Sequence, residues 1–416
     1  MTGVQTCALP ISRIVRTGTA YASLGAALAD ARRNDELTVR GTCTGRIGIA
    51  KDVTIRGIRA TGTGTPTIAG DGAGITVAIE KDRTVALVGL AVTNGVSAGA
   101  AGGIVTGAGS DVRLTDVVVR SNTGSSAAGG IGVSGAMRID GRSVVTGNTG
   151  VAGGGIGVTG GSLTLAGHAR VSGNTAGSGG GIHASFGGTV TILGSAEVGG
   201  NTATVDGGGV MVDRSTVRIR GEASIHDNEA SGRGGGVFAK GGVTPGSGSL
   251  VIVEGQATVR ANTAGGNGGG IAGTASTIRV RGTASIAAND SGGTGGGIHS
   301  DHDTLIAVGE RAAIVGNVAA VRGGGLGIDA TAAATIAGRA RIVDNLTSGV
   351  GGGIWANAMT VTLDDQAAVR KNRTFTNGGG IVVQDGTLHL FGTSRVRLNI
   401  APAATVGGVV MAGSGL

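Results

Sequence analysis

The chain has 416 residues, of which 89 are glycine, 4 are proline and only 1 % are aromatic. So little proline excludes collagen and a disordered tract rich in proline and glycine, and the composition departs from that of ordinary globular domains. The formal net charge of +7 comes almost entirely from arginine, and arginine-rich usage beside much alanine and glycine is the usual result of GC-rich coding, which is the favoured interpretation. A basic exterior that attracts anionic polymers is the alternative.

The first segment, residues 1–12, resembles the translated read of a short-read sequencing adapter. We expect it to be an assembly artefact, with the natural N-terminus and any signal peptide upstream of this sequence. Without Cys7, Cys43 is the only cysteine, so no internal disulfide is predicted. A small buried residue in a strand is the favoured interpretation of Cys43, and a nucleophile is the alternative.

Residues 13–93 are expected to form an N-terminal cap and the first, irregular coils. The only helical pattern lies in residues 21–32, where one face carries Leu24, Ala27, Leu28 and Ala31. It precedes strand-like segments at 37–39 and 53–55. We therefore expect a short helix that covers the open end of the core, because an exposed terminal coil offers unpaired backbone to other chains.

Residues 94–416 contain a regular repeat marked by asparagine. Each of eleven asparagines lies three residues after a valine or an isoleucine, and consecutive ones are 26 to 28 residues apart, with one step of 34. A period of this size with strand-like residues inside it is typical of a solenoid. The eleven are Asn122, Asn148, Asn174, Asn201, Asn228, Asn262, Asn289, Asn317, Asn345, Asn372 and Asn399.

A glycine run follows each asparagine and ends, eight to ten residues after it, in a branched apolar residue such as Ile182 or Ile298. A third apolar segment with alternation, such as 162–165, completes three short strands per repeat. No connection is long enough for a crossover helix. The sequence therefore predicts an all-β fold, a single right-handed parallel β-helix of about 27-residue coils with a stacked asparagine ladder.

The glycines are expected to supply positive φ angles and room for neighbouring coils. A phosphate-binding loop is the alternative, but such loops occur singly and precede a helix. The extra residues of the 34-residue step, around 240–249, predict a surface loop inserted at a turn. Another coil begins at residues 409–416, so we expect the natural chain to continue.

Two clusters are candidates for chemistry. Residues 299–303 (His-Ser-Asp-His-Asp) suit a metal or acid–base site, but solvated turn residues are the favoured interpretation. Asp364 and Asp365 are paired carboxylates, yet adjacent strand residues point to opposite faces. We therefore predict no catalytic, cofactor-binding or metal-binding residue and no cofactor. The other histidines are expected singly on outward positions: His168, His183, His226 and His389.

Enzymes that cleave polysaccharides also use this fold, and their clefts need aromatic residues and several acids beside a basic residue. Here Trp355 and Phe238 are expected to face outward singly. The enzyme hypothesis predicts that Asp301, Asp303 or Asp364 lies in a groove with arginine neighbours. A binder of ice or crystal surfaces is a third hypothesis, but its threonine array would be interrupted at Arg218 and Arg279.

The repeat resembles that of polymorphic outer-membrane proteins, within the wider pectin-lyase-like superfamily. The likeness covers residues 102–410 and rests on segments such as 171–174 (Val-Ser-Gly-Asn) with 180–182 (Gly-Gly-Ile). Valine or isoleucine replaces the phenylalanine of that family's motif, and glycine replaces its alanine. The resemblance implies a secreted β-helix and, less directly, adhesion.

The leading hypothesis is thus a non-catalytic, exported bacterial surface or extracellular protein, adhesin-like or stalk-like. The alternative is a carbohydrate-active enzyme, a polysaccharide lyase or a glycoside hydrolase. The basic exterior suggests anionic glycans or host and cell-surface components as partners. Nucleic acid is not expected, because no aromatic residues are interleaved for base stacking. No transmembrane segment is predicted, because no apolar stretch reaches about 18 residues.

Overall fold

The computed structural model describes residues 6–7, 12–59, 64–242, 248–329, 331–402 and 405–412. These residues form a right-handed parallel β-solenoid with coils of about 27 residues and one short helix near the N-terminus, which confirms the predicted fold class. The chain divides into two compact units, and each is described by itself. Unit 1 comprises Met1–Thr191 with Ser195–Glu197, and unit 2 comprises Ile192–Gly194 with Val198–Leu416.

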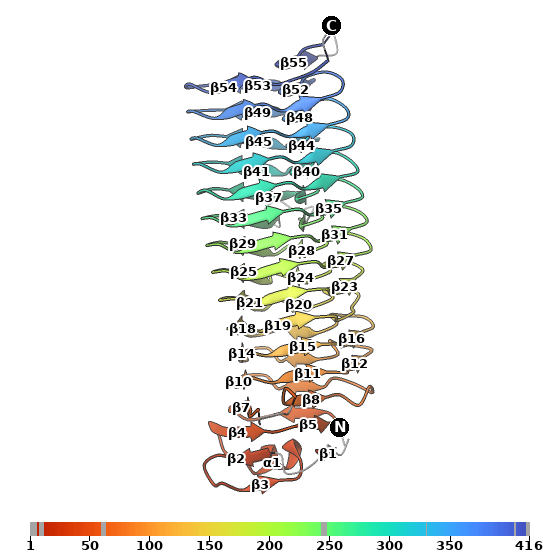
Figure 1. The fold of residues 1–416 in the computed structure, drawn as a ribbon, viewed down its shortest axis with the longest axis vertical. Helices are drawn as coiled ribbons and strands as arrows, with labels where there is room; N and C mark the ends of the chain where they lie inside the picture. The colour runs from red at the N-terminus through yellow and green to blue at the C-terminus, as the bar shows by residue number, and fades with distance from the viewer. Residues whose placement is uncertain are drawn as a thin grey trace. The chain divides into compact units, whose positions relative to one another are not determined.

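In unit 1 each coil adds one strand to each of three parallel sheets, and the strands of one sheet stack coil upon coil (Figure 1). Sheet A contains β5 (Thr42–Thr44), β8 (Thr67–Ala69), β11 (Ala91–Thr93), β15 (Val118–Arg120), β19 (Val144–Thr146) and β22 (Arg170–Ser172). Sheet B contains β4 (Asp35–Val39), β7 (Val53–Gly57), β10 (Thr84–Val88), β14 (Asp111–Thr115), β18 (Ala136–Asp140) and β21 (Ser162–Leu165). Sheet C contains β6 (Ile47–Ile49), β9 (Val77–Ile79), β13 (Ile104–Thr106), β17 (Ile131–Val133), β20 (Ile156–Thr159) and β24 (Ile182–Ser185).

Shorter elements complete unit 1. Two-residue strands follow the asparagine turn. β12 (Val96–Ser97) and β16 (Thr123–Gly124) form a two-stranded sheet, and β23 (Thr175–Ala176) is the first strand of a separate sheet, sheet D. Antiparallel strands occur at the N-terminus, where β1 (Thr6–Cys7) pairs with β5 and β2 (Ser12–Ile14) pairs with β3 (Ala20–Tyr21) and β4. Two strands have residues in both units, namely β25 (Thr189–Ile192) of sheet B and β26 (Glu197–Gly199) of sheet A.

Unit 2 repeats the same coil. Its sheet A contains β30 (Ser224–His226), β34 (Thr258–Arg260), β38 (Ser285–Ala287), β42 (Ala313–Val315), β46 (Arg341–Val343), β50 (Ala368–Arg370) and β54 (Arg395–Arg397). Its sheet B contains β29 (Thr216–Ile219), β33 (Ser249–Val253), β37 (Ser276–Val280), β41 (Leu305–Val308), β45 (Ala333–Ile336), β49 (Thr360–Leu363) and β53 (Thr387–Leu390).

The remaining strands of unit 2 belong to sheets C and D. Sheet C contains β28 (Val210–Asp213), β32 (Val237–Lys240), β36 (Ile271–Thr274), β40 (Ile298–Asp301), β44 (Leu326–Ile328), β48 (Ile354–Asn357), β52 (Ile381–Gln384) and β55 (Val409–Ala412). Sheet D contains β27 (Thr202–Ala203), β31 (Glu229–Ala230), β35 (Thr263–Ala264), β39 (Asp290–Ser291), β43 (Val318–Ala319), β47 (Leu346–Thr347) and β51 (Arg373–Thr374).

The apolar core is built from columns of equivalent residues. In sheet C of unit 2, Ile298 pairs in register with Leu326, which pairs with Ile354, and all three are fully buried. Inward positions alternate with outward ones along each strand, because successive strand residues point to opposite faces. Valine, isoleucine and leucine fill these columns, and their summed burial is the main stabilising term of each coil.

The predicted asparagine ladder is present in both units. In unit 1, Asn122 Nδ2 donates to Asn148 Oδ1 at 3.0 Å, and Asn148 Nδ2 donates to Asn174 Oδ1 at 2.9 Å. In unit 2 the same bond, at 2.9 to 3.0 Å, links eight consecutive asparagines from Asn201 to Asn399. The ladder therefore satisfies buried amides that would otherwise be costly to desolvate.

The glycine runs serve the two purposes predicted for them. Gly295 has a φ of 72°, a conformation that favours glycine. At Gly296 an added Cβ would collide with the carbonyl oxygens of Val318 and Gly324 in the next coil. The runs are thus places where neighbouring backbones approach closely.

The predicted N-terminal helix is α1 (Leu24–Asp30), shorter than the helical pattern. Ser23 caps it by accepting a hydrogen bond from the Ala26 N–H at 3.1 Å. Its buried face packs on β2, β3, β4 and β6. Among the described residues, no helix is long and apolar enough to cross a membrane.

Two further predictions have definite outcomes. The extra residues of the long repeat lie between β32 and β33, so the coil continues around them as expected, although residues 243–247 lie outside the described part. Cys43 is a fully buried strand residue, as predicted. The prediction of no disulfide is wrong, because Cys43 is disulfide-bonded in the structure. The backbone pairing of β1 with β5 places Cys7 opposite Cys43. This pairing is not predicted from the sequence, because residues 1–12 are expected to lie outside the natural protein and are left out of the predicted fold.

Candidate functional site

The outward side of sheet C in unit 2 is covered. Phe238 and Trp355, both expected to face outward singly, are each only 1 % exposed. The guanidinium carbon of Arg233 lies 4.3 Å from the Phe238 ring centre, and that of Arg322 lies 4.7 Å from the Trp355 ring. The segment between sheets D and C folds over these rings, so the expectation of free aromatic side chains is wrong.

His299 occupies the same outward column, in register with Ala272 and Gly327. It is 3 % exposed, its Nε2 lies 3.2 Å from Asn267 Nδ2, and its Nδ1 has no hydrogen-bond partner among the described residues. Burial lowers the pKa of His299 to about 4, with an opposing effect of Asp301 and a further lowering by Arg233. The interpretation as a solvated turn residue is therefore wrong for His299.

The rest of the 299–303 segment does form a solvated turn. His302 and Asp303 are exposed, and both have positive φ angles. His302 Nδ1 lies 2.6 Å from Asp301 Oδ1. Among the described residues, no group of three or more histidine, cysteine, aspartate or glutamate side chains is placed to hold a metal ion.

Asp301 and Asp329 form a carboxylate pair here that is not among the sequence predictions. Asp329, half-buried after β44, lies one coil beyond Asp301, and its backbone N–H donates to Ser300 O at 2.8 Å. Burial raises the pKa of Asp329, and the charge of Asp301 raises it further, while Arg322 and His302 act in the opposite direction. An acid with a raised pKa beside a second carboxylate is an arrangement that can support acid–base chemistry.

The pair would have been visible in the sequence as a column. Asp329 follows Asp301 by one repeat, a step of 28 residues. The equivalent position one coil earlier is Thr274, which pairs with Asp301. Aligning the repeats on their glycine runs would have placed both aspartates together.

Asp364 and Asp365 have structural partners instead. Asp365 Oδ2 accepts from the Gly338 N–H of the preceding coil at 3.0 Å, and Asp364 Oδ1 accepts from the Asp365 N–H at 2.7 Å. They lie at the corner between sheets B and A, and Asp301 lies at the end of a sheet C strand. The structure does not bring these candidates together.

The other histidines show mixed exposure. His168 and His389 are exposed as expected, whereas His183 and His226 are half-buried. His226 Nδ1 lies 2.7 Å from Asp227 Oδ2. None of the four belongs to a group of three or more histidine, cysteine, aspartate or glutamate side chains that could hold a metal ion within the described part of the chain.

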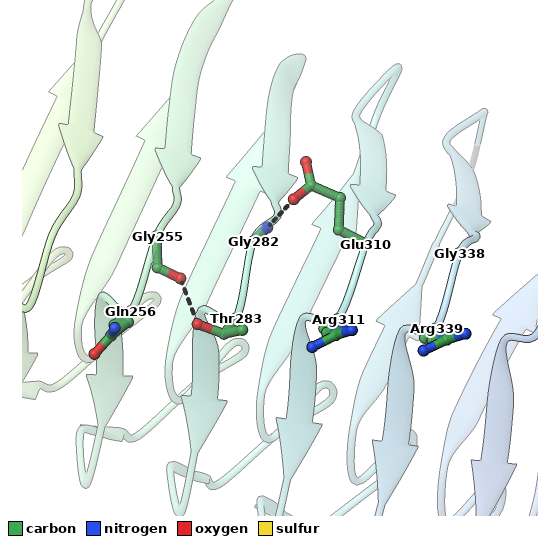
Figure 2. Close-up of a pocket in the computed structure, with 8 residues that line it drawn as sticks. All are labelled: Gly255, Gln256, Gly282, Thr283, Glu310, Arg311, Gly338 and Arg339. Carbon is green, nitrogen blue, oxygen red and sulfur yellow. Dashed lines mark hydrogen bonds between the residues drawn. The ribbon is translucent and has the colours of Figure 1, made fainter.

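A polar groove of about 650 Å³ follows the corner between sheets B and A over four coils of unit 2 (Figure 2). Each coil contributes two residues, the first with a positive φ angle, such as 75° at Gly282 and 57° at Glu310. Figure 2 shows Arg311 and Arg339 next to each other on successive coils. The groove is lined by Gly255, Gln256, Gly282, Thr283, Glu310, Arg311, Gly338 and Arg339.

The one carboxylate among the residues that line this groove is engaged with the backbone. Glu310 Oε2 accepts from the Gly282 N–H at 3.0 Å (Figure 2). Arg339 Nε donates to Gln366 Oε1 at 3.2 Å. The two arginines of the groove keep donors for an external acceptor, since five guanidinium protons exceed these contacts.

Comparisons of this chain with protein-family models, with curated proteins and with solved structures give no match. The function must therefore be inferred from the arrangement of side chains on the solenoid, because a fold alone does not imply an activity.

Proposed function

We propose that this protein is a non-catalytic, exported bacterial surface or extracellular protein, an adhesin-like or stalk-like passenger that presents outward side chains to its partners. The main observation in support of this proposal is the unbroken regularity of the coils. In unit 2 the asparagine ladder runs through eight asparagines without an interruption. Enzyme sites usually break such local regularity, because catalytic groups trade stability for chemistry.

The resemblance to repeats of polymorphic outer-membrane proteins supports an extracellular or outer-surface location. A net charge of +7 supports anionic glycans or cell-surface components as partners. Neither a cofactor nor a metal has a role in this function.

The test expresses the complete gene product and follows it by cell fractionation and surface labelling. Export with binding to whole cells or matrix is the expected result. A protein known to stay in the cytoplasm of the same cells serves as the fractionation control. Retention of the complete product in the cytoplasm would contradict the proposal.

A carbohydrate-active enzyme, lyase or hydrolase, is the second candidate, and the Asp301–Asp329 pair favours it. In that case protonated Asp329 serves as the acid, ionised Asp301 serves as the base, and Arg322 binds an acidic substrate group. Release of reducing ends or unsaturated products from uronate polymers, abolished by Asp329→Asn and by Asp301→Asn, is the expected result for an enzyme. A panel of such polymers without cleavage would remove this candidate.

A further inference from the structure

Six arginines of unit 2 lie on four successive coils of one side of the solenoid. Arg311 and Arg339 line the corner groove (Figure 2), and the other four lie on the adjoining strands β46, β50 and β54 of sheet A. None of the six forms an ion pair within the described residues. We call this set the basic face; its members are Arg311, Arg339, Arg341, Arg370, Arg395 and Arg397.

Arginines elsewhere on the solenoid are commonly neutralised. In unit 1, Arg113 and Arg138 share the carboxylate of Asp140 at 2.7 and 3.0 Å, and Arg170 lies 3.1 Å from Glu197. In earlier coils of unit 2, Arg233 pairs with Asp206 and Arg281 with Glu254.

Three carboxylates beside the basic face form no ion pair with its arginines among the described residues. Asp344 is exposed, and its backbone N–H donates to Arg370 O at 3.3 Å. Glu310 and Asp365 each accept a backbone N–H from the preceding coil, as described above. The face therefore retains uncompensated positive charge.

The spacing of the basic face follows the strand spacing. Arg370 and Arg397 are register partners on neighbouring parallel strands, about 4.8 Å apart. Arg341 and Arg395 take the same position two strands apart, with the small Ala368 between them. Like charges opposite one another destabilise a sheet, so this row favours a ligand that supplies a negative charge to each coil.

We propose that the basic face binds a linear polysaccharide with a carboxylate on each sugar, laid across successive coils. The planar guanidinium fork matches a carboxylate through two hydrogen bonds, and all six cations are arginine. Strands β46, β50 and β54 contain no aromatic residue, so the stacking platform that single-stranded nucleic acid requires is absent from them. This inference rests on the proposed function and names the partner of the exported protein.

The experiment measures binding of the full chain to immobilised polygalacturonate by biolayer interferometry, at about 50 mM and about 200 mM salt. The variant R341Q/R370Q/R395Q/R397Q is expected to bind at least about tenfold more weakly at the lower salt and to show a smaller salt dependence. Circular dichroism melting confirms that each variant is folded. Polygalacturonate whose carboxylates are fully methyl-esterified has the same backbone without the charge, and it should not bind.

The matched control R218Q/R220Q/R260Q/R279Q removes the same number of charges from exposed or half-exposed positions elsewhere in unit 2, where Arg218 and Arg279 are separated by Ile252. This control should bind like the wild type. An equal loss of polygalacturonate binding in both variants would overturn the proposal. So would binding of the wild type to the methyl ester, or its tighter binding to duplex DNA or to anionic lipid vesicles. Shortening of the polymer in the eluate would refute the non-catalytic function instead, so the two failures are distinguishable.

Discussion

Replacement of a single ladder asparagine tests whether the stacked amides stabilise the solenoid. Asn289 is 1 % exposed, and its Nδ2 donates to Asn317 Oδ1 at 2.9 Å and to Val259 O at 3.0 Å. Its Oδ1 accepts from both the backbone N–H and the Nδ2 of Asn262, at 3.0 and 2.9 Å. Asn289→Ala leaves two buried donors of Asn262 unpaired. Each buried unpaired group costs about 1–3 kcal/mol, and the small cavity adds to this cost. The free energy of unfolding is therefore expected to fall by about 3–5 kcal/mol.

The assay is local, because each coil of a solenoid contacts only its neighbours and the chain need not unfold in one step. Hydrogen exchange followed by mass spectrometry should show lost protection in the peptides around Asn262, Asn289 and Asn317, with less change in distant coils. Asn357→Ala is the matched control, because Asn357 lies outside the ladder and is half-exposed. This control should change the free energy of unfolding by no more than about 0.5 kcal/mol.

The isosteric change Asn289→Asp sharpens the test. It keeps the acceptor for Asn262 but turns the donating nitrogen into an oxygen that faces Asn317 Oδ1 and Val259 O. We expect a loss at least as large as that of alanine at neutral pH, and a partial recovery at acid pH, where the protonated carboxyl donates again. Equal protection in Asn289→Ala and Asn357→Ala, or no recovery of Asn289→Asp at low pH, would refute the argument.

Three further outcomes are expected. Gly296→Ala should destabilise its coil strongly because its Cβ meets backbone oxygens, whereas Gly309→Ala, with open space around it, should be nearly neutral in thermal melting. The pKa of His299 is lowered to about 4 from 6.5, so the unfolded chain takes up the proton first. Stability should therefore fall as the pH drops from 6.5 to about 4, and His299→Gln should flatten that slope in denaturant titrations. The raised pKa of Asp329 has the opposite effect on stability, which is lost as the pH rises through that pKa. Asp329→Asn should therefore raise the denaturant midpoint at pH 7.

The coil itself could be predicted from the sequence because its requirements recur in every repeat. A buried amide needs a partner one coil away, and a close backbone approach needs glycine, so Asn289 and Gly296 are constrained by neighbours of the same kind. Periodicity makes both constraints visible in a single chain. The loop after Lys240 could be predicted for the same reason, since it shifts the period without disturbing the columns.

The covered outer face could not be predicted in this way. Phe238 and Trp355 follow the strand alternation and do point away from the core, but a segment outside the strands folds over them. That segment has a strong glycine pattern and no apolar periodicity, so its contacts depend on side chains such as Arg233 and Arg322. The Asp301–Asp329 pair escapes a search for reactive residues within one repeat, because the solenoid brings residues together across repeats.

This geometry separates stability from recognition along the chain. Inward positions are fixed by register, because a change at one coil disturbs the columns above and below it. Outward positions carry no such constraint, and a charge there affects mainly the same position on neighbouring coils. A row of arginines such as Arg370 and Arg397 then has two physical solutions: carboxylates of the same chain, as Asp140 provides for Arg113, or carboxylates of a ligand. Uncompensated rows are therefore where a solenoid of this kind should be searched for its partner.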